Sequence, residues 1–551
     1  MASINQQESQ SKKLKKKKYF DVDPWVFWPS TILIVFFISI TLLVGEPMNQ
    51  VFASVQDSVS EYGGWLFVLA VNVFLFFCFW VAFSKYGNIR LGGRKAKPEF
   101  KRLSWFAMLF SAGMGIGILF WSVGEPVLHY VSPPGGEGET IEAAQKSMQY
   151  TFLHWGFHAW GIYALVGLSL AFFTFNRKLP LTISSVFYPL LGERIHGKFG
   201  KIINVLAVVA TLFGLATSLG LGVQQVSAGL NHLTGLSDTV NMQVLLIGII
   251  TLAATASVVS GLGKGVKRLS QLNMILGALF LLFMLIVGPT LFIFSSFVQN
   301  TGAYLQEFFQ LSFWTETYTQ SDWQQSWTVF YWAWWISWSP FVGMFIARIS
   351  RGRTIREFIL GVLIVPTIIT FFWLSTFGGS ALFLELNALA DIQTAVKENV
   401  ATSLYVLLEN FPIGSFTSLV AIILVTSFFV TSSDSGSLVV DSLTAGGKLD
   451  APVAQRVFWA LTEGGVAAVL LLGGGLAALQ TAAISTGLPF MVILLFMAYS
   501  LTKGLSREHN MLMKFELEKE RKSYKDIISE LVTKRDSKTK PEKNDSDEEN
   551  K

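Results

Sequence analysis

Residues 331–345 of this 551-residue chain concentrate aromatic side chains inside one apolar segment. They read Tyr-Trp-Ala-Trp-Trp-Ile-Ser-Trp-Ser-Pro-Phe-Val-Gly-Met-Phe, with four tryptophans within seven positions. Steps of three and four residues share one helix face, so Trp335, Trp338, Phe341 and Phe345 fall together. Tryptophan in a membrane helix normally lies near the headgroups, whereas aromatic faces at depth attract organic cations. The pattern indicates either packing and lipid-facing tryptophan or a binding site for a quaternary ammonium group.

A second unusual segment is rich in glycine, because residues 111–117 read Ser-Ala-Gly-Met-Gly-Ile-Gly. Each glycine weakens a helix by about 1 kcal/mol and lets the backbone approach a ligand. Backbone exposed at membrane depth is tolerated only where it lines a cavity or is buried in protein. The aromatic segment contains Pro340 and Gly343, which predict a second disturbed helix. Two interrupted spans at corresponding positions indicate a central transport site, whereas the glycines alone are typical of close helix packing.

Two adjacent hydroxyls, Thr431 and Ser432, lie near the end of another apolar stretch. Na⁺ is a hard cation that favours oxygen ligands, and these side chains supply two of them. Serine and threonine also bond to carbonyls one turn earlier in their own helix, so the pair alone leaves both functions open. His154 and His158 lie one turn apart in a further span, as in a proton relay or as histidines satisfied by packing.

The composition excludes an ordinary soluble domain, because 52% of residues are hydrophobic, 14% are charged and the mean hydropathy is +0.49. A helix needs roughly 20 apolar residues to cross a bilayer. Twelve stretches approach or exceed that length, at residues 25–44, 65–83, 103–128, 148–175, 201–229, 241–260, 271–297, 326–347, 355–384, 404–432, 454–473 and 481–502. The expected fold class is therefore an all-α polytopic membrane protein with twelve transmembrane helices. The single Cys78 lies in the second span and forms no disulfide framework.

Basic residues are concentrated in alternate loops. They include Lys12, Lys13, Lys15, Lys16, Lys17, Lys18, Lys85, Arg90, Arg94, Lys95, Lys97, Lys101, Arg102, Arg177, Lys178, Arg194, Lys198, Lys201, Lys264, Lys267, Arg268, Arg348, Arg351, Arg353 and Arg356. The intervening loops 45–64, 129–145 and 298–325 contain no Lys or Arg, only acids such as Glu46, Asp57, Glu137, Glu139, Glu307 and Asp322. The excess of Lys and Arg in cytoplasmic loops predicts that both termini face the cytoplasm. The net charge of +5 is thus expected to reflect topology and contact with anionic lipid, with no nucleic-acid partner.

Three motifs together resemble the betaine/carnitine/choline transporter family, in particular its glycine betaine uptake type. They are Gly-Met-Gly-Ile-Gly at 113–117, Gly-Glu-Pro at 124–126, and Trp-Ala-Trp-Trp-Ile-Ser-Trp-Ser-Pro-Phe-Val-Gly at 332–343. The resemblance runs from about Asp23 to Thr502. It implies a neurotransmitter:sodium symporter-like core of two inverted five-helix repeats, and often a homotrimer.

The resemblance also implies an aromatic box around a trimethylammonium group. The implied substrate-binding residues are Trp155, Trp160, Tyr163, Trp335, Trp338, Phe341, Gly113, Met114, Gly115 and Gly117, and the implied gate at the cytoplasmic exit is Phe345. The glycine segment would present backbone to the substrate carboxylate. Choline-type members carry an acid where this chain has Gly117. Its absence favours a zwitterion, whose own charges cancel.

Sodium-coupled members of that family bind Na⁺ between the third and tenth spans. The matching positions are the carbonyls of Ser111, Met114 and Phe428 with the hydroxyls of Thr431 and Ser432. A second sodium position in such members uses two hydroxyls of the fifth span, one turn apart. Here Thr211 is followed one turn later by Leu215, so the sodium stoichiometry stays open. Sodium-independent exchangers place a fixed cation near this site, and no Lys or Arg lies in the middle of a span near Thr431.

The expected function is sodium-coupled import of a zwitterionic compatible solute, most of all glycine betaine, for osmoprotection across a bacterial plasma membrane. Na⁺ is the expected coupling ion, and no organic cofactor is expected. The expected organisation is a basic tail (1–22), two peripheral helices (23–102), a first repeat (103–297), an outer surface segment (298–325), a second repeat (326–503) and a charged cytoplasmic tail (504–551). The alternative is Na⁺-independent or proton-coupled transport of ectoine, proline betaine, carnitine or choline.

The alternatives to transport are a membrane enzyme and an osmosensor. A membrane enzyme acting on lipid would need a reactive centre, and the chain has no HExxH motif and no evident nucleophile–histidine pair. An osmosensor that does not transport would use the charged C-terminal tail. It would bind solute without accumulating it.

Overall fold

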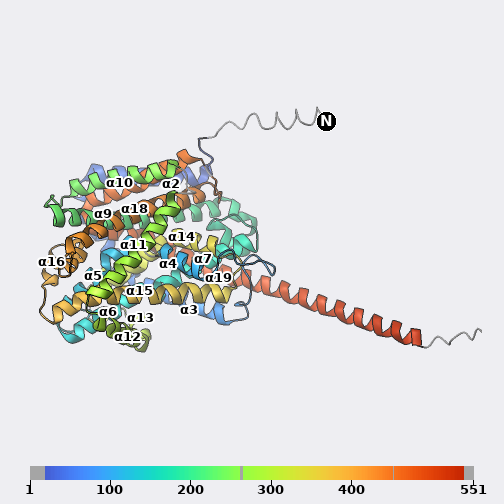
Figure 1. Ribbon diagram of the computed structural model, residues 1–551. Helices are drawn as coiled ribbons and strands as arrows, with labels where there is room; N and C mark the ends of the chain where they lie inside the picture. Colours follow the sequence, from blue (N-terminus) through green and yellow to red (C-terminus); the bar gives the residue numbers. More distant parts are fainter. Residues whose placement is uncertain (1–18, 114, 261–264, 320, 451, 539–551) are drawn as a thin grey trace, which may run out of the picture. The chain divides into compact units, whose positions relative to one another are not determined.

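The computed structural model describes residues 19–538 apart from 114, 261–264, 320 and 451. Helices dominate these residues, and the only β-type pairing recorded among them is an isolated bridge between Arg90 and Thr354 (Figure 1). The chain divides into two compact units, residues 1–501 and 502–551. The expectation of an all-helical, polytopic membrane protein is confirmed.

Nine helices of the described residues are long and apolar enough to cross a membrane, or ten if a bent pair counts as one span. These nine are α2 (Pro24–Val44), α3 (Met48–Phe83), α6 (Ile141–Trp155) together with α7 (Phe157–Phe175), α9 (Lys198–Thr234), α10 (Val240–Ser260), α11 (Gly265–Val287), α15 (Ile355–Leu386), α18 (Gly414–Thr444) and α19 (Val453–Lys538). The buried helix α14 (Phe330–Ile349) is not counted among them. The bent pair is α4 (Arg102–Gly113) with α5 (Ile116–Val131). The shorter elements are η1 (Ser184–Phe187), α8 (Tyr188–Leu191), η2 (Gly192–His196), α12 (Thr290–Gln306), α13 (Phe308–Phe313), η3 (Gln325–Val329), α16 (Ile392–Glu398), η4 (Val400–Thr402) and α17 (Ser403–Glu409).

Two of the expected spans have different boundaries. The stretch 404–432 is not one helix, because α17 ends at Glu409 and α18 begins only at Gly414, after Ile413 with a φ of 57°. The stretch 271–297 is divided between α11 and α12 at Gly288 and Pro289, where proline has no N–H to continue the helix. Apolar residues continue through both breaks, so the spans predicted from composition were too long.

A glycine also divides the expected fourth span. Helix α6 ends at Trp155 and α7 starts at Phe157, with Gly156 between them at φ −93° and ψ −141°. A side chain at Gly156 would meet the ring of Phe371, which packs there. The break leaves the carbonyl groups at the end of α6 without their regular partners.

The prediction of a disturbed helix at Pro340 is wrong, because α14 continues as an α-helix from Phe330 to Ile349. Proline cannot donate to the carbonyl four residues earlier, which here belongs to Ile336. The Ser339 hydroxyl donates to that carbonyl instead, at 2.7 Å. The neighbouring serine thus satisfies the group that proline leaves free.

Helix α14 lies inside the first unit. It packs against α7 and α9, and α9 packs in turn against α18, while α15 packs against α5 and α7 (Figure 1). Every residue from Phe330 to Met344 is buried. A helix that is apolar on all sides requires such a central position, and it carries the aromatic segment into the interior.

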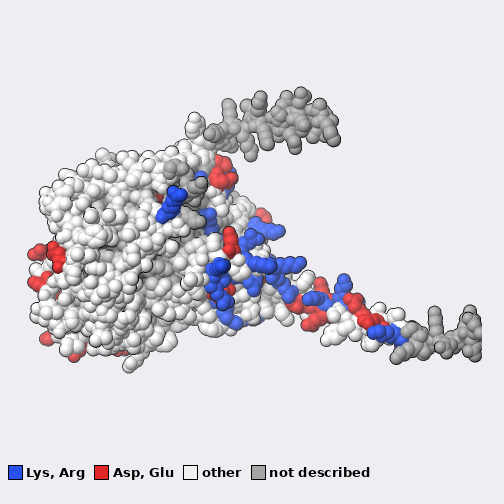
Figure 2. All heavy atoms as spheres, viewed as in Figure 1, with Lys and Arg blue, Asp and Glu red and all other residues white. Residues whose placement is uncertain are grey.

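Charged residues of the first unit gather at two ends. Figure 2 shows only Asp and Glu at one end of this unit and mostly Lys and Arg, with some Asp and Glu, at the opposite end, with a broad surface of other residues between them. That uncharged surface includes exposed apolar side chains of α10 and α11, such as Leu252, Leu279 and Ile286. An uncharged belt between two charged ends is typical of a membrane-spanning unit.

The second unit is a helix from Thr502 to Lys538, the last part of α19. Its apolar residues Ile527, Ile528 and Leu531 are exposed. The first unit contains the part of α19 that covers both expected C-terminal spans, and these are separated by Gly475 with a φ of 59°.

Candidate functional site

Helix α14 brings its tryptophans into contact with the break between α6 and α7. The rings of Trp334 and Trp335 stack with centroids 4.6 Å apart and planes inclined by 15°. Trp155, the last residue of α6, meets Trp335 edge to face at 5.0 Å. These three rings are buried in protein. The lipid-facing interpretation of these tryptophans is therefore wrong.

Helix α7 completes the group of rings. The Tyr163 centroid lies 6.3 Å from that of Trp335 and 6.2 Å from that of Trp338. Trp160 meets Tyr163 edge to face at 5.7 Å. The aromatic cluster, as we call it below, consists of Trp155, Trp160, Tyr163, Trp334, Trp335 and Trp338. The structure thus brings together all the tryptophan and tyrosine residues expected in the box, and it adds Trp334.

The two phenylalanines follow the cluster along α14. Phe341 is buried, with its ring centroid 5.5 Å from that of Trp338. Phe345 lies one turn further and is partly exposed. The positions of both agree with the expected order of box face and gate, and the gating role stays a prediction.

Two hydrogen-bonding groups inside the aromatic cluster lack a partner among the described residues. They are the Tyr163 hydroxyl and the Trp338 Nε1, and the two side chains are 1% and 6% exposed. Buried donors are nearly always paired, because an unpaired one costs the free energy of its desolvation. Two unpaired donors here indicate a place that a water molecule or an acceptor group of a ligand completes.

The glycine break lies against the aromatic cluster. Helix α4 ends at Gly113 and α5 begins at Ile116, with a bend of 67° between them. A Cβ atom at Gly113 would overlap the ring of Trp160. A Cβ atom at Gly117 would lie 2.7 Å from the Trp334 ring and 3.2 Å from the Trp155 ring. Glycine is therefore required for this close approach of helix and rings.

The expected sodium ligands lie in two places: Ser432 faces the glycine break, whereas Ser111 and Phe428 line a largely apolar cavity. Gly115 faces α18, and the nearest atom to a Cβ built there is the Ser432 Oγ at 4.0 Å. Ser111 and Phe428 line one cavity of about 380 Å³ between α4, α11, α15 and α18. Met114, expected both to bind substrate and to ligate sodium, lies outside the described residues.

The Thr431 hydroxyl already has hydrogen bonds within the protein. It donates toward the carbonyls of Ser427 and Phe428, both at 3.1 Å, and it accepts from Asn273 Nδ2 at 3.2 Å. Asn273, on α11, is a neighbour that sequence reasoning missed. At the second sodium position Thr211 donates to the carbonyl of Ala207 at 2.6 Å, as helix threonines commonly do.

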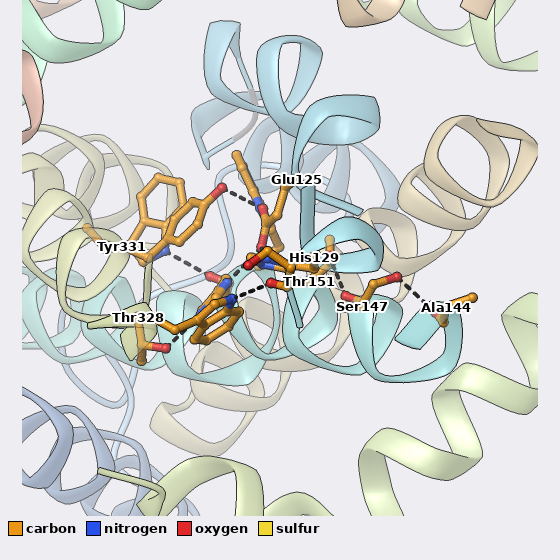
Figure 3. A network of polar contacts seen from close by, with 12 residues as sticks. Glu125, His129, Ala144, Ser147, Thr151, Thr328 and Tyr331 are labelled. Atoms are coloured by element: carbon orange, nitrogen blue, oxygen red, sulfur yellow. Dashed lines mark hydrogen bonds and ion pairs between the residues drawn. The ribbon is translucent and has the colours of Figure 1, made fainter. Parts of the chain in front are cut away.

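A buried carboxylate lies beside the aromatic cluster, where Glu125 of α5 is 0% exposed (Figure 3). Its Oε2 accepts from Trp155 Nε1 at 2.7 Å and from the Tyr331 hydroxyl at 2.5 Å. Its Oε1 lies 2.7 Å from His154 Nδ1 and 3.3 Å from His129 Nε2. The other His154 nitrogen, Nε2, lies 3.0 Å from the Thr328 hydroxyl. One carboxylate thus contacts side chains of α5, α6 and α14.

The two histidines expected as a possible relay have different partners. His154 contacts Glu125, whereas His158 Nε2 lies 3.2 Å from the Asn72 Oδ1 of α3. No hydrogen bond among the residues described links the two histidines. Their separate partners favour packing and positioning over a relay between them.

Glu125, His129 and His154 could also be considered as metal ligands, since their ligating atoms lie within 4.8 Å of one another. The distances of 2.7 Å and 3.3 Å to Glu125 Oε1 are hydrogen-bond distances. The second carboxylate oxygen is occupied by Trp155 and Tyr331. The arrangement is that of a hydrogen-bonded network.

Comparisons with known proteins identify the family of this chain and several of its relatives. The sequence profile of the betaine/carnitine/choline family of transporters matches residues 25–510. Glycine betaine transporter 1 of Vibrio parahaemolyticus is 47% identical over 499 residues, which cover 89% of this chain and 95% of that protein. The glycine betaine transporter OpuD of Bacillus subtilis is 45% identical over 497 residues, covering 89% and 96%. A glycine betaine/proline/choline/ectoine transporter of V. parahaemolyticus is 46% identical over 500 residues, covering 89% and 88%.

Proposed function

The chain belongs to the betaine/carnitine/choline family of transporters, and from that premise we propose that it imports glycine betaine or a closely related zwitterionic solute, driven by Na⁺. The observation that carries the proposal is the buried aromatic cluster, in which α6, α7 and α14 present rings to one another deep in a membrane protein. Such rings attract a quaternary ammonium through their negative faces, by about 2 kcal/mol when the contact is desolvated. Relatives with the printed name of glycine betaine transporter support the choice of solute.

The polar end of the solute is proposed to meet the two unpaired donors. Tyr163 and Trp338 each belong to the aromatic cluster, and their hydroxyl and indole N–H have no acceptor within the described part of the chain. A carboxylate accepts from both kinds of donor and makes stronger hydrogen bonds than a neutral acceptor does. A solute with a trimethylammonium at one end and a carboxylate at the other therefore matches both features of the site.

The sodium site is proposed between α4, α5 and α18. Its support is the proximity of Ser432 to Gly115 at the glycine break. Na⁺ takes oxygen ligands from carbonyls and hydroxyls, which these segments supply. Binding of an ion across the glycine break would couple the bend of α4 and α5 to the position of α18.

In the cell we propose a homotrimer in the bacterial plasma membrane, with both termini in the cytoplasm and a role in osmoprotection. The resemblance described above supports the trimer and the role. The separation of basic and acidic ends in Figure 2 supports the orientation, because Lys and Arg are retained on the cytoplasmic side. Contact of that basic end with anionic lipid follows from the same charges.

The test is uptake of labelled glycine betaine by proteoliposomes containing the purified protein. We expect accumulation with an inward Na⁺ gradient and none when K⁺ replaces Na⁺. The variant Thr431→Val with Ser432→Ala should require more Na⁺ for half-maximal uptake and recover at saturating Na⁺, because water replaces the lost ligands poorly.

Thr417→Val is the matched control, since that hydroxyl also lies on α18 and bonds to its own helix at Gly414. Uptake that proceeds equally without Na⁺ would refute the coupling. Accumulation of choline or ectoine but not of betaine would favour the broader solute range of the V. parahaemolyticus relative. Binding without accumulation would instead favour a sensor.

A further inference from the structure

Glu125 is a carboxylate in a position that is costly for a charge. Its side chain is 0% exposed, and it lies in α5, the second half of the bent helix pair that is apolar and long enough to cross a membrane. An ionisable group inside a membrane segment is expensive and is retained where it has a function. The partners of Glu125 indicate what that function is (Figure 3).

The two oxygens of Glu125 have separate partners. Oε2 accepts hydrogen bonds from Trp155 and Tyr331, while Oε1 faces the histidines. The first pair belongs to the aromatic environment, because the Tyr331 centroid lies 5.6 Å from Trp155 and 5.7 Å from Trp335. Oε2 therefore fixes two neighbouring rings with one atom.

Trp155 is held to α5 at two places. Its indole N–H donates to Glu125, and its ring packs where a Cβ of Gly117 would lie 3.2 Å away. Gly117 and Glu125 are eight positions apart, about two turns of the same helix. A shift of α5 relative to α6 would therefore have to move or release the Trp155 ring.

The same region also fixes Trp335. Because α6 ends at Trp155, the backbone carbonyl of His154 lacks its regular helical partner. Trp335 Nε1 donates to this carbonyl at 2.9 Å. His154 thus holds Trp335 with its backbone and contacts Glu125 with its ring.

We propose that Glu125 is a positioning residue for solute binding: it orients Trp155 and Tyr331 and ties the aromatic cluster to the helix that follows the glycine break. The inference rests on the proposed function, in which the cluster holds the solute. Glu125 does not itself contact the solute. It acts through the rings that it holds.

The proposal assigns the effect to hydrogen-bond acceptance at Oε2 and not to the negative charge. Glutamine in place of Glu125 keeps one amide oxygen, which can accept from both Trp155 and Tyr331. Its amide NH₂ can donate to His154 Nδ1, while His154 Nε2 donates to Thr328. Alanine removes all of these contacts.

The experiment measures betaine affinity of the purified full chain, by equilibrium binding and by the KM and maximal rate of proteoliposome uptake. Glu125→Ala should weaken binding about tenfold, since two buried donors lose their acceptor. Glu125→Gln should restore affinity to near the wild-type value. Similar losses in Gln and Ala would overturn the proposal, because charge would then be the cause.

A double substitution tests whether Glu125 acts through Trp155. Trp155→Phe keeps a ring but removes the N–H, and it should weaken binding by itself. The Glu125→Ala, Trp155→Phe pair should then lose clearly less affinity than the product of the two single losses, because linked residues are not additive. If the loss of affinity in the double variant equals the product of the two single losses, the two residues act independently and the proposal is contradicted.

His158→Gln serves as the control for loss of a buried histidine contact in the same span, because His158 bonds to Asn72 and not to Glu125. It should leave betaine affinity within about twofold of wild type. If Glu125→Ala does not fold, the Gln variant and Trp155→Phe still test the proposal by the same measurements. Wild-type protein that fails to bind betaine would refute the proposed function, whereas normal binding by Glu125→Ala would refute this inference alone.

Discussion

At the scale of single residues, the stacked tryptophans of α14 are the part of the site that spacing predicted best. Steps of three and four placed Trp335 and Trp338 on one helix face, and the structure puts both rings beside Tyr163. Trp334 was missed because it falls outside that face. Since α14 is buried on all sides, the adjacent face also packs against the glycine segment. A one-dimensional pattern cannot show that a helix is enclosed by others.

The tryptophans themselves can be tested by side-chain replacement. Trp338→Leu should weaken betaine binding by about 1–2 kcal/mol, and Trp338→Phe by less, because phenylalanine keeps a π face. The measurement is equilibrium binding to the purified protein. Trp459→Phe is the matched control: that indole is also buried, but it donates to Thr444 and lies outside the aromatic cluster. Wild-type affinity in the Leu variants of both Trp335 and Trp338 would remove the cluster from the binding site.

Glu125 shows why part of the site escaped sequence reasoning. Its motif was recognised only as a mark of family resemblance, and its partners His154 and Tyr331 lie 29 and 206 positions away. Hydrogen bonds between distant spans leave no periodic signal. An acid within an apolar stretch was the one available indication, because such residues are rarely present without a role.

At the scale of helices, composition located the spans but not their ends. Apolar residues predicted the helices α2, α9 and α15 within a few positions. Breaks were predicted where glycines cluster, as between α4 and α5, and were missed where one glycine or proline suffices, as at Gly156. Pro340 was the opposite error, since Ser339 satisfies the carbonyl that proline leaves free. Whether a proline or glycine ends a helix depends on whether a nearby group forms a hydrogen bond with the carbonyl that would otherwise lack a partner.

The contact of α5 with α14 provides a test of solute selectivity. Gly117→Asp adds a side chain against the Trp334 and Trp155 rings, so that some loss of transport comes from crowding. Gly117→Ala adds the same Cβ without charge and is the matched control. At an effective dielectric of about 20, one charge interaction at roughly 4 Å approaches 4 kcal/mol before desolvation.

Relative to Ala, the Asp variant should therefore lose betaine uptake and gain choline uptake. Competition between the two solutes in proteoliposomes measures the ratio. An equal ratio in the two variants would place Gly117 away from the bound solute.

At the scale of the whole molecule, the motifs predicted the family, and the alternation of charged loops predicted a separation of charge between two ends. The alternation of basic and acidic loops agrees with the two charged ends of the first unit in Figure 2. Long-range packing of the helices could not be predicted in this way, because every membrane helix offers a similar apolar surface. The five-helix repeats and the sodium stoichiometry stay predictions.

Orientation can be measured with single cysteines. Cys78 is 0% exposed, so a Cys78→Ser background should fold and be unreactive. Glu137→Cys, in the expected outer loop, should react with a membrane-impermeant maleimide in intact cells. Lys97→Cys, exposed at the basic end, should react only after permeabilisation. Labelling in the reverse order would invert the proposed topology.

The shared oxygen of Glu125 restricts how this chain can vary in evolution. Trp155 and Tyr331 come from different helices and depend on the same acceptor atom. Loss of Glu125 leaves two buried donors without their acceptor. Loss of either donor leaves a buried carboxylate with fewer hydrogen bonds to offset its desolvation. Substitutions at these positions are therefore not independent mutational steps. We therefore expect these three residues to change together rather than one at a time.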